Sequence, residues 1–210
     1  MIDLYTWSTP NGRKISIALE EMGLDYTVHE INIGKGEQRE EPFAALSPNH
    51  KIPAIIDRDT GREMMESGAI LLYLADKTGR FMPTDQDGYW EAMQWLMWQM
   101  AHIGPMLGQA HHFLFNNPGN SDYAEERYAK EAQRLYGVLD RRLEGRQYIV
   151  GDYSIVDMAT WPWISRFERQ RVDPRKFPNV ERWYREIAAR PAVERGYDVP
   201  ARGEAIPMPG

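Results

Sequence analysis

The hydrophobic pattern of the first part of the chain predicts alternating strands and helices. Ile2 and Leu4 alternate with polar neighbours in a strand over residues 1–7, and residues 26–31 form a second strand. Between them, apolar residues at three- and four-residue steps predict a helix that ends near Gly23. Two strands joined by a helix pair in parallel through a right-handed crossover.

The following segment predicts the rest of a small sheet. We expect a short helix from about Gln38 to Leu46 and a hairpin over residues 53–65, which turns at Asp59-Thr60-Gly61. A helix should then run from Ser67 to Lys77, because this apolar stretch lacks breakers until Gly79. The order β-α-β-α-β-β-α predicts an α/β thioredoxin-like N-terminal domain.

The remainder of the chain has a helical pattern and predicts an all-α C-terminal domain. Gly, Pro and Asp gather in residues 78–88, so we expect a linker there, a first domain over 1–79 and a second over 88–210. The predicted helices are Tyr89–Phe115, Ser121–Leu143, one that starts with a capping box at Ser154 and Asp157, and a final one over Val180–Arg190. We expect the tail after Gly196 to be poorly ordered.

Composition narrows the classes of function. The chain has 210 residues, a formal net charge of -6 and no cysteine. The acidic balance argues against nucleic-acid binding. The absence of cysteine excludes disulfides and a protein-borne redox thiol, although a bound substrate can bring a sulfur atom. No signal peptide and no apolar run of roughly 18 residues is present, so we expect a cytoplasmic protein that does not bind membranes.

The turn Thr9-Pro10-Asn11-Gly12 stands where the first helix begins. The first-turn amides and the helix dipole favour negative charge there, and a thiol at a helix N-terminus has a lowered pKa. The Thr9 hydroxyl or the Asn11 amides could donate to such a sulfur. Ser8 and Tyr5 are competing hydroxyls, and ordinary helix capping is the alternative interpretation of these turn residues.

Two further strings could bind a peptide. If the Ile52–Pro53 bond were cis, the Ile52 backbone could pair with an added strand, but the pattern alone favours trans. Lys51 could pair with a carboxylate. Glu66 and Ser67, at a helix start, could hold an amino group and a carboxylate, with plain capping as the alternative.

The histidines do not have the spacing of a metal site. His111 and His112 are adjacent on a helix and point in different directions, and His102 forms no His-x-x-x-His pair with either. We therefore predict no metal.

Several strings together resemble the cytosolic glutathione transferases over nearly the whole chain, and within them the bacterial nu class of disulfide-bond oxidoreductases. The strings are Thr9-Pro10-Asn11-Gly12, Ser47–Ile55, Gly104–Gln109, Trp161-Pro162-Trp163 and Arg190-Pro191-Ala192.

The resemblance implies a role for each candidate residue. Thr9 and Asn11 would lie beside the glutathione sulfur as the catalytic residues. The remaining predicted glutathione contacts are Ile52 before a cis-Pro53 for the cysteinyl backbone, Glu66 and Ser67 for the γ-glutamyl end, Gln38 and Lys51 elsewhere on the peptide, and Arg127 for a carboxylate near a dimer interface.

The implied activity is glutathione-dependent reduction of small disulfides by a homodimer. Each site would hold two glutathiones or one glutathione disulfide. Two alternatives remain open: conjugation of glutathione to electrophiles, and a non-catalytic glutathione-binding or regulatory module.

Overall fold

The computed structural model describes residues 1–210, which form two compact units. The first contains Met1–Arg80 together with Ala189–Ile206, and the second contains Phe81–Ala188 together with Pro207–Gly210. Packing thus places residues 189–206 with the N-terminal part of the chain, whereas we expected all of 88–210 to form one domain. The domain boundaries of 1–79 and 88–210 stay a prediction.

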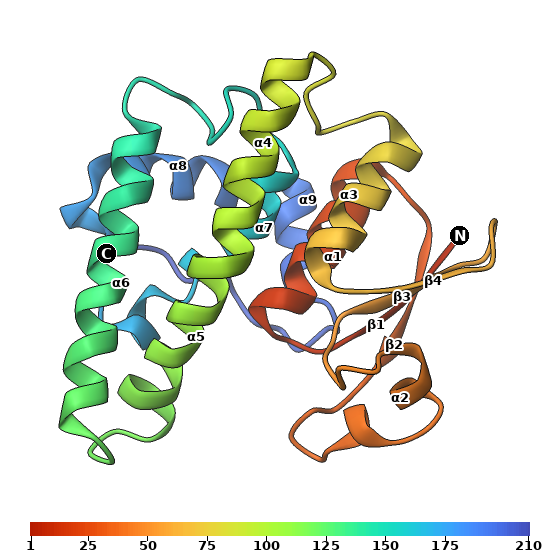
Figure 1. Ribbon diagram of the computed structural model, residues 1–210, viewed down its shortest axis with the longest axis horizontal. Helices are drawn as coiled ribbons and strands as arrows, with labels where there is room; N and C mark the ends of the chain where they lie inside the picture. The colour runs from red at the N-terminus through yellow and green to blue at the C-terminus, as the bar shows by residue number, and fades with distance from the viewer. The chain divides into compact units, whose positions relative to one another are not determined.

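The first unit contains the predicted sheet (Figure 1). Its strand order is β2-β1-β3-β4, with β1 parallel to β2 and antiparallel to β3, and β3 antiparallel to β4. The strands are β1 (Ile2–Thr6), β2 (Tyr26–Glu30), β3 (Ala54–Asp57) and β4 (Arg62–Met65). This arrangement confirms the thioredoxin-like fold that the alternating pattern predicted.

Helices cover both faces of this sheet. The helices α1 (Pro10–Met22) and α3 (Ser67–Thr78) pack against each other on one face. The other face packs through Tyr5 and Ala54 against Phe43, in the short helix α2 (Phe43–Leu46). The predicted helix over 38–46 is wrong in extent: a 3-10 turn, η1 (Glu37–Arg39), precedes α2, and Pro42 separates them because it has no amide hydrogen.

A helix that the pattern did not predict, α9 (Pro191–Tyr197), packs against α1. The approach is close at Gly196, where a β-carbon would lie 2.6 Å from the α-carbon of Ile17. The Ser16 hydroxyl donates to the Gly196 carbonyl at 2.6 Å. This contact explains why residues 189–206 belong with the first unit.

Residues of the tail that follows α9 form hydrogen bonds with one another and with the first unit, and the poor order expected after Gly196 stays a prediction. The Asp198 carboxylate accepts the backbone amide of Arg202 at 2.8 Å and that of Glu204 at 3.1 Å. Arg13, which is fully buried, donates to the Tyr197 carbonyl at 2.7 Å and pairs with Glu204. The chain after α9 therefore turns back onto α1.

The second unit is all helical, as predicted. Its helices and short helical turns are α4 (Gln86–Trp98), η2 (Gln99–Ile103), α5 (Gly104–His111), η3 (His112–Asn116), α6 (Asp122–Leu143), α7 (Ile155–Ile164), η4 (Phe167–Gln170), η5 (Pro174–Lys176) and α8 (Pro178–Ala188). The predicted helix over 89–115 is interrupted by π-helical turns at η2 and η3. Pro105, just after η2, lacks the amide hydrogen of a regular ladder.

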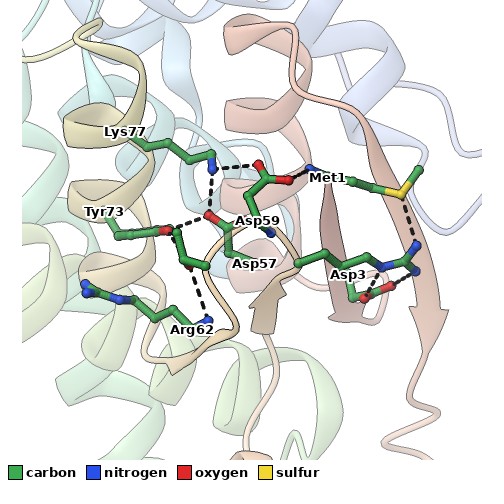
Figure 2. Close-up of polar contacts among 9 residues, drawn as sticks. Met1, Asp3, Asp57, Asp59, Arg62, Tyr73 and Lys77 are labelled. Atoms are coloured by element: carbon green, nitrogen blue, oxygen red, sulfur yellow. Dashed lines mark hydrogen bonds and ion pairs between the residues drawn. The ribbon is translucent and has the colours of Figure 1, made fainter.

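Polar contacts close the end of the sheet where β1 begins and β3 ends (Figure 2). The Asp57 carboxylate accepts from the Tyr73 hydroxyl and from the Lys77 ammonium, the latter at 2.8 Å. Lys77 also donates to Asp59 at 2.9 Å, and the amino group of Met1 donates to Asp59 at 3.0 Å. These bonds tie the β3–β4 turn and the N-terminus to α3.

Asp3 lies beside this cluster and gives a testable acid dependence of stability. The Arg58 guanidinium and then His29 lower the pKa of Asp3 to about 2, against the opposing effect of burial. A carboxyl with a lowered pKa stabilises the fold above its unfolded pKa, so this contribution should disappear as the pH falls from about 4 to about 2.

Asp3→Asn should therefore lower the free energy of unfolding by about 1 kcal/mol at neutral pH, a small value because Arg58 is partly exposed to water. Denaturant unfolding of both proteins at several pH values measures this. A difference that persists unchanged at about pH 2 would contradict it.

None of the helices in the described chain combines the length and the hydropathy that a bilayer crossing requires.

Candidate active site at one edge of the sheet

The strand register brings three loops to one edge of the sheet. Tyr5 near the end of β1 is opposite Ala54 at the start of β3, and Ala54 is opposite Met65 at the end of β4. The segments that follow β1 and β4 and the segment that precedes β3 therefore meet at this edge. They contain Thr9, Pro53 and Ser67.

The start of α1 is built as the sequence predicts. Thr9 is the N-cap, and its Oγ1 accepts the Gly12 amide at 3.1 Å. No group of the chain accepts a hydrogen bond from the Thr9 hydroxyl, so its hydrogen can be donated to a ligand. A β-carbon at Gly12 would collide with the Thr6 hydroxyl and the Trp7 carbonyl, so glycine lets the helix begin this close to the strand.

The other residues predicted to lie near the glutathione sulfur, Asn11, Tyr5 and Ser8, have different surroundings. Asn11 is the second residue of α1, so its backbone amide belongs to the first helical turn, where negative charge is favoured. The Tyr5 ring stacks on His29 with 4.6 Å between ring centroids and packs against Phe43, and burial raises its pKa. Tyr5 thus serves the packing of the sheet, whereas Ser8 is half-buried beside Thr9.

The segment before β3 offers an unused backbone edge. The Ile52–Pro53 bond is cis, as the family resemblance implied and the residues alone did not. The backbone amide and carbonyl of Ile52 bond to no other group of the chain. The loop is fixed by Ser47, whose hydroxyl donates to the Lys51 carbonyl at 2.9 Å, while the Lys51 residue itself is exposed. A peptide could pair with Ile52 and place a carboxylate near Lys51.

Glu66 departs from ordinary capping. It precedes α3 with φ 68° and ψ 110°, and its side chain caps no helix amide. A non-glycine residue with positive φ is uncommon, and such strain gathers at functional sites. Its carboxylate instead accepts from Asn49 Nδ2 at 3.4 Å, a partner that the sequence pattern did not indicate.

Ser67 is the first residue of α3, and it receives a contact that the sequence pattern did not predict either. The Lys14 ammonium donates to Ser67 Oγ at 3.2 Å, and Lys14 is only 1% exposed. Lysine is seldom buried, so a lysine in a helix is normally assigned to the surface. The packing of α1 against α3 brings Ser67 to the Lys14 ammonium.

Gln38 shows an unsatisfied polar atom. Its amide oxygen Oε1 is buried and accepts no hydrogen bond in the described chain. Buried polar groups are normally paired, so this oxygen is suited to a donor from a ligand. The peptide contact expected for Gln38 stays a prediction.

Arg127 belongs to the second unit. It is on α6 and lines a cavity of about 500 Å³ together with Tyr123 and Arg134. Its contact with a glutathione carboxylate stays a prediction.

Two of the three histidines singled out in the sequence, His111 and His112, bond to other side chains. His111 bonds to the Gln170 side chain at 3.0 Å and lies 5.5 Å from the Trp163 ring centroid, and burial lowers its pKa to about 4. His112 contacts Asn117. No cluster of three or more possible metal ligands occurs among residues 1–210.

Comparison with protein families identifies the two units. The N-terminal domain of glutathione S-transferases matches residues 9–77, and the C-terminal domain of the same family matches residues 102–191. The chain belongs to the glutathione S-transferase family. All the predicted site residues fall within these two matches.

Two curated members of the glutathione S-transferase family are similar over most of the chain. Disulfide-bond oxidoreductase YfcG of Escherichia coli K12 is 49% identical over 92% of this chain and 93% of its own length. Disulfide-bond oxidoreductase YghU of the same organism is 39% identical over 93% of this chain and 73% of its own length.

Solved structures of the family carry ligands. A glutathione transferase from Burkholderia graminis, with two glutathione molecules per subunit, superposes with a TM-score of 0.91 at 46% identity, over 96% of this chain and 89% of its own. A glutathione transferase from Pseudomonas putida, with one glutathione disulfide per subunit, superposes with a TM-score of 0.89 at 41% identity, over 95% of this chain and 92% of its own.

Proposed function

We propose that this glutathione S-transferase family member reduces small disulfides with glutathione bound at the sheet edge where α1 begins. The observation that supports this proposal most is the Thr9 hydroxyl at the N-terminus of α1, whose hydrogen has no acceptor in the chain. The chain itself has no cysteine. The reactive sulfur must come from the substrate, and the start of α1 is suited to hold it as a thiolate.

The reaction requires two thiol–disulfide exchanges. The bound glutathione thiolate attacks one sulfur of the substrate disulfide, forming a mixed disulfide and releasing one substrate thiolate, which takes up a proton. A second glutathione thiolate attacks the glutathione sulfur of the mixed disulfide. This step releases the other substrate thiol and yields glutathione disulfide, so two glutathiones are oxidised for each disulfide reduced.

The chain would contribute orientation and charge stabilisation. Thr9 and the Asn11 amide would donate to the thiolate, and the unpaired backbone groups of Ile52 would hold the cysteinyl residue. Glu66 would bind the α-amino group of the γ-glutamyl residue, and Ser67 its carboxylate. These contacts fix the sulfur in place before the reaction, which reduces the entropic cost of the attack.

The relatives support this choice among the family's reactions. YfcG and YghU are both named disulfide-bond oxidoreductases. Neighbouring structures hold two glutathiones or one glutathione disulfide per subunit, which match the reductants and the oxidised product of the proposed reaction. The nu-class assignment is part of the same proposal.

Parallel assays test the proposal. We expect turnover of hydroxyethyl disulfide with glutathione that exceeds conjugation of glutathione to an aryl halide. Absence of disulfide turnover above the uncatalysed rate would overturn the proposal. Faster conjugation would favour the transferase alternative, and tight binding without either activity would favour the non-catalytic alternative.

Glu66→Gln should weaken glutathione binding about tenfold, because it removes the charge that pairs with the ligand amino group. Isothermal titration calorimetry measures the affinity. Glu63→Gln, an exposed carboxylate three positions earlier on β4, is the matched control and should bind as the parent does. Equal affinities for all three proteins would remove Glu66 from the site.

We infer that the protein is a homodimer. The helix α4 exposes Trp90 to 55% and Met97 to 47%, and large exposed apolar side chains are typical of interfaces. The predicted contact of Arg127 near a dimer interface belongs to the same inference. Sedimentation at several concentrations measures the oligomeric state.

A cytoplasmic location remains a prediction from the sequence.

A further inference from the structure

Lys14 is a buried cation whose head group lies against the predicted γ-glutamyl site. Its side chain extends from the first half of α1 to the first residue of α3, where the ammonium is 3.2 Å from Ser67 Oγ. Ser67 is also buried, with 7% exposure. Burying a lysine costs free energy, so a buried lysine beside a binding residue requires a physical explanation.

We propose that Lys14 is a positioning residue for the anionic end of the ligand. Its ammonium donates a hydrogen bond to the Ser67 oxygen and thereby directs the Ser67 hydroxyl hydrogen toward the α-carboxylate of the γ-glutamyl group. The same ammonium supplies the countercharge for that carboxylate. The inference rests on the proposed function in taking glutathione as the ligand of this site.

The hydrogen bond between Lys14 and Ser67 has only one possible direction when the lysine is charged. An ammonium has only donors, so it must donate to the Ser67 oxygen. That oxygen then uses a lone pair on Lys14, and its own hydrogen is oriented away from the ammonium. A hydroxyl fixed in this way donates to an anion better than one that can rotate, because less rotational freedom is lost on binding.

The protonation of Lys14 depends on its burial and on the charges around it. Burial lowers the pKa of Lys14 to about 7, and the negative charge of Glu66 opposes this shift. Asp76 on α3 and Glu194 on α9 are further charged residues of the helices packed against α1, and the other charged groups there form pairs. The pairs are Arg13 with Glu204 and the Tyr197 carbonyl, Glu20 with Arg195, Glu21 with Arg190, Asp3 with Arg58, and Lys77 with Asp57.

A bound carboxylate would add negative charge beside the ammonium and raise the pKa of Lys14. Ligand binding should then take up a proton near neutral pH, and affinity should fall as the pH rises through about 7 to 8. A lysine that served packing alone would show no such coupling, because its protonation would not respond to the ligand.

Calorimetry with S-methylglutathione tests this coupling, because its blocked sulfur cannot titrate. Measured in buffers of different ionisation enthalpy, binding to the parent protein at about pH 7.5 should take up about half a proton per ligand, and the affinity should fall about fivefold between about pH 6.5 and 8.5. N-acetyl-S-methylcysteinylglycine, which lacks the γ-glutamyl group and has no amine that titrates near neutral pH, should bind without proton uptake.

Lys14→Met keeps the length of the side chain and removes the charge. It should bind S-methylglutathione roughly tenfold more weakly at about pH 6.5, lose the proton uptake, and vary less than about twofold in affinity across the pH range. Because a charged lysine is costly to bury, the melting temperature should stay at or above that of the parent. Lys35→Met, at an exposed lysine, is the control and should behave as the parent.

The outcomes separate this inference from the proposed function. If the parent binds S-methylglutathione without proton uptake and Lys14→Met has the same pH profile, the role of Lys14 is overturned while the glutathione site stands. If the parent does not bind S-methylglutathione at all, the proposed function fails and this inference fails with it. The proton uptake is measured on the parent protein, so the test holds even if Lys14→Met does not fold.

Discussion

Thr9→Val should lower kcat for glutathione-dependent reduction of hydroxyethyl disulfide about 100-fold, the loss typical of removing one donor to a developing anion. The Thr9 hydroxyl donates to no group of the chain, so its hydrogen is available to the glutathione sulfur. Valine keeps the shape of threonine and removes the hydroxyl. The affinity for glutathione should change less than about threefold, because the proposed bond is strongest to the thiolate that attacks.

Thr9→Ser is the matched control, because it retains the hydroxyl and should stay within a few-fold of the parent. Both variants need a stability measurement, since valine also removes the N-cap of α1 at a cost of about 1 kcal/mol. The ultraviolet absorbance of the bound thiolate gives an independent measurement: the pKa of the glutathione thiol should be higher in Thr9→Val. A thiol pKa and a kcat equal to those of the parent would exclude Thr9 from the reaction.

Asp157→Ala should lower the free energy of unfolding by about 3–5 kcal/mol, the largest change in stability that we expect from one side chain. Asp157 is fully buried at the start of α7. Its carboxylate accepts the Trp183 indole at 2.8 Å, the Ile149 amide at 3.1 Å, and both the amide and the hydroxyl of Ser154. Alanine would leave these donors buried without an acceptor.

The measurement is guanidinium unfolding at about pH 7.5, because burial raises the pKa of Asp157 to about 6 and the carboxylate is then ionised. Asp85→Ala is the control. Asp85 caps α4 by accepting the Gly88 amide at 2.8 Å, but it is exposed, so water can replace it and the expected loss is about 1 kcal/mol. Similar losses in the two variants would contradict the importance of burial at Asp157.

Local patterns predicted the features that depend on neighbours in the chain. The capping box at Ser154 and Asp157 is present, since both residues lie in one helical turn. The cap at Thr9 and the helix that follows depend on four adjacent residues. The alternation of strands and helices likewise predicted the sheet. These features follow from backbone geometry over a few residues, which the sequence determines directly.

The features that the pattern missed depend on contacts between distant segments. Lys14 and Ser67 are 53 positions apart, and they meet only because α3 packs against α1. The hydroxyl of Ser16 reaches Gly196 across 180 positions, which places α9 in the first unit. The positive φ of Glu66 also belongs to this group, because the backbone there is held by the strand before it and the helix after it.

The sequence by itself determined the four strands, the helices with strong local signals and their order along the chain, and the residue types suited to hold a sulfur atom that the substrate supplies. Only the tertiary structure decided which of those side chains are enclosed, which donors and acceptors remain unused, and which charges lie together. The physical reason is that propensity and capping act over one or two turns, whereas desolvation and pairing depend on whatever the folded chain brings alongside.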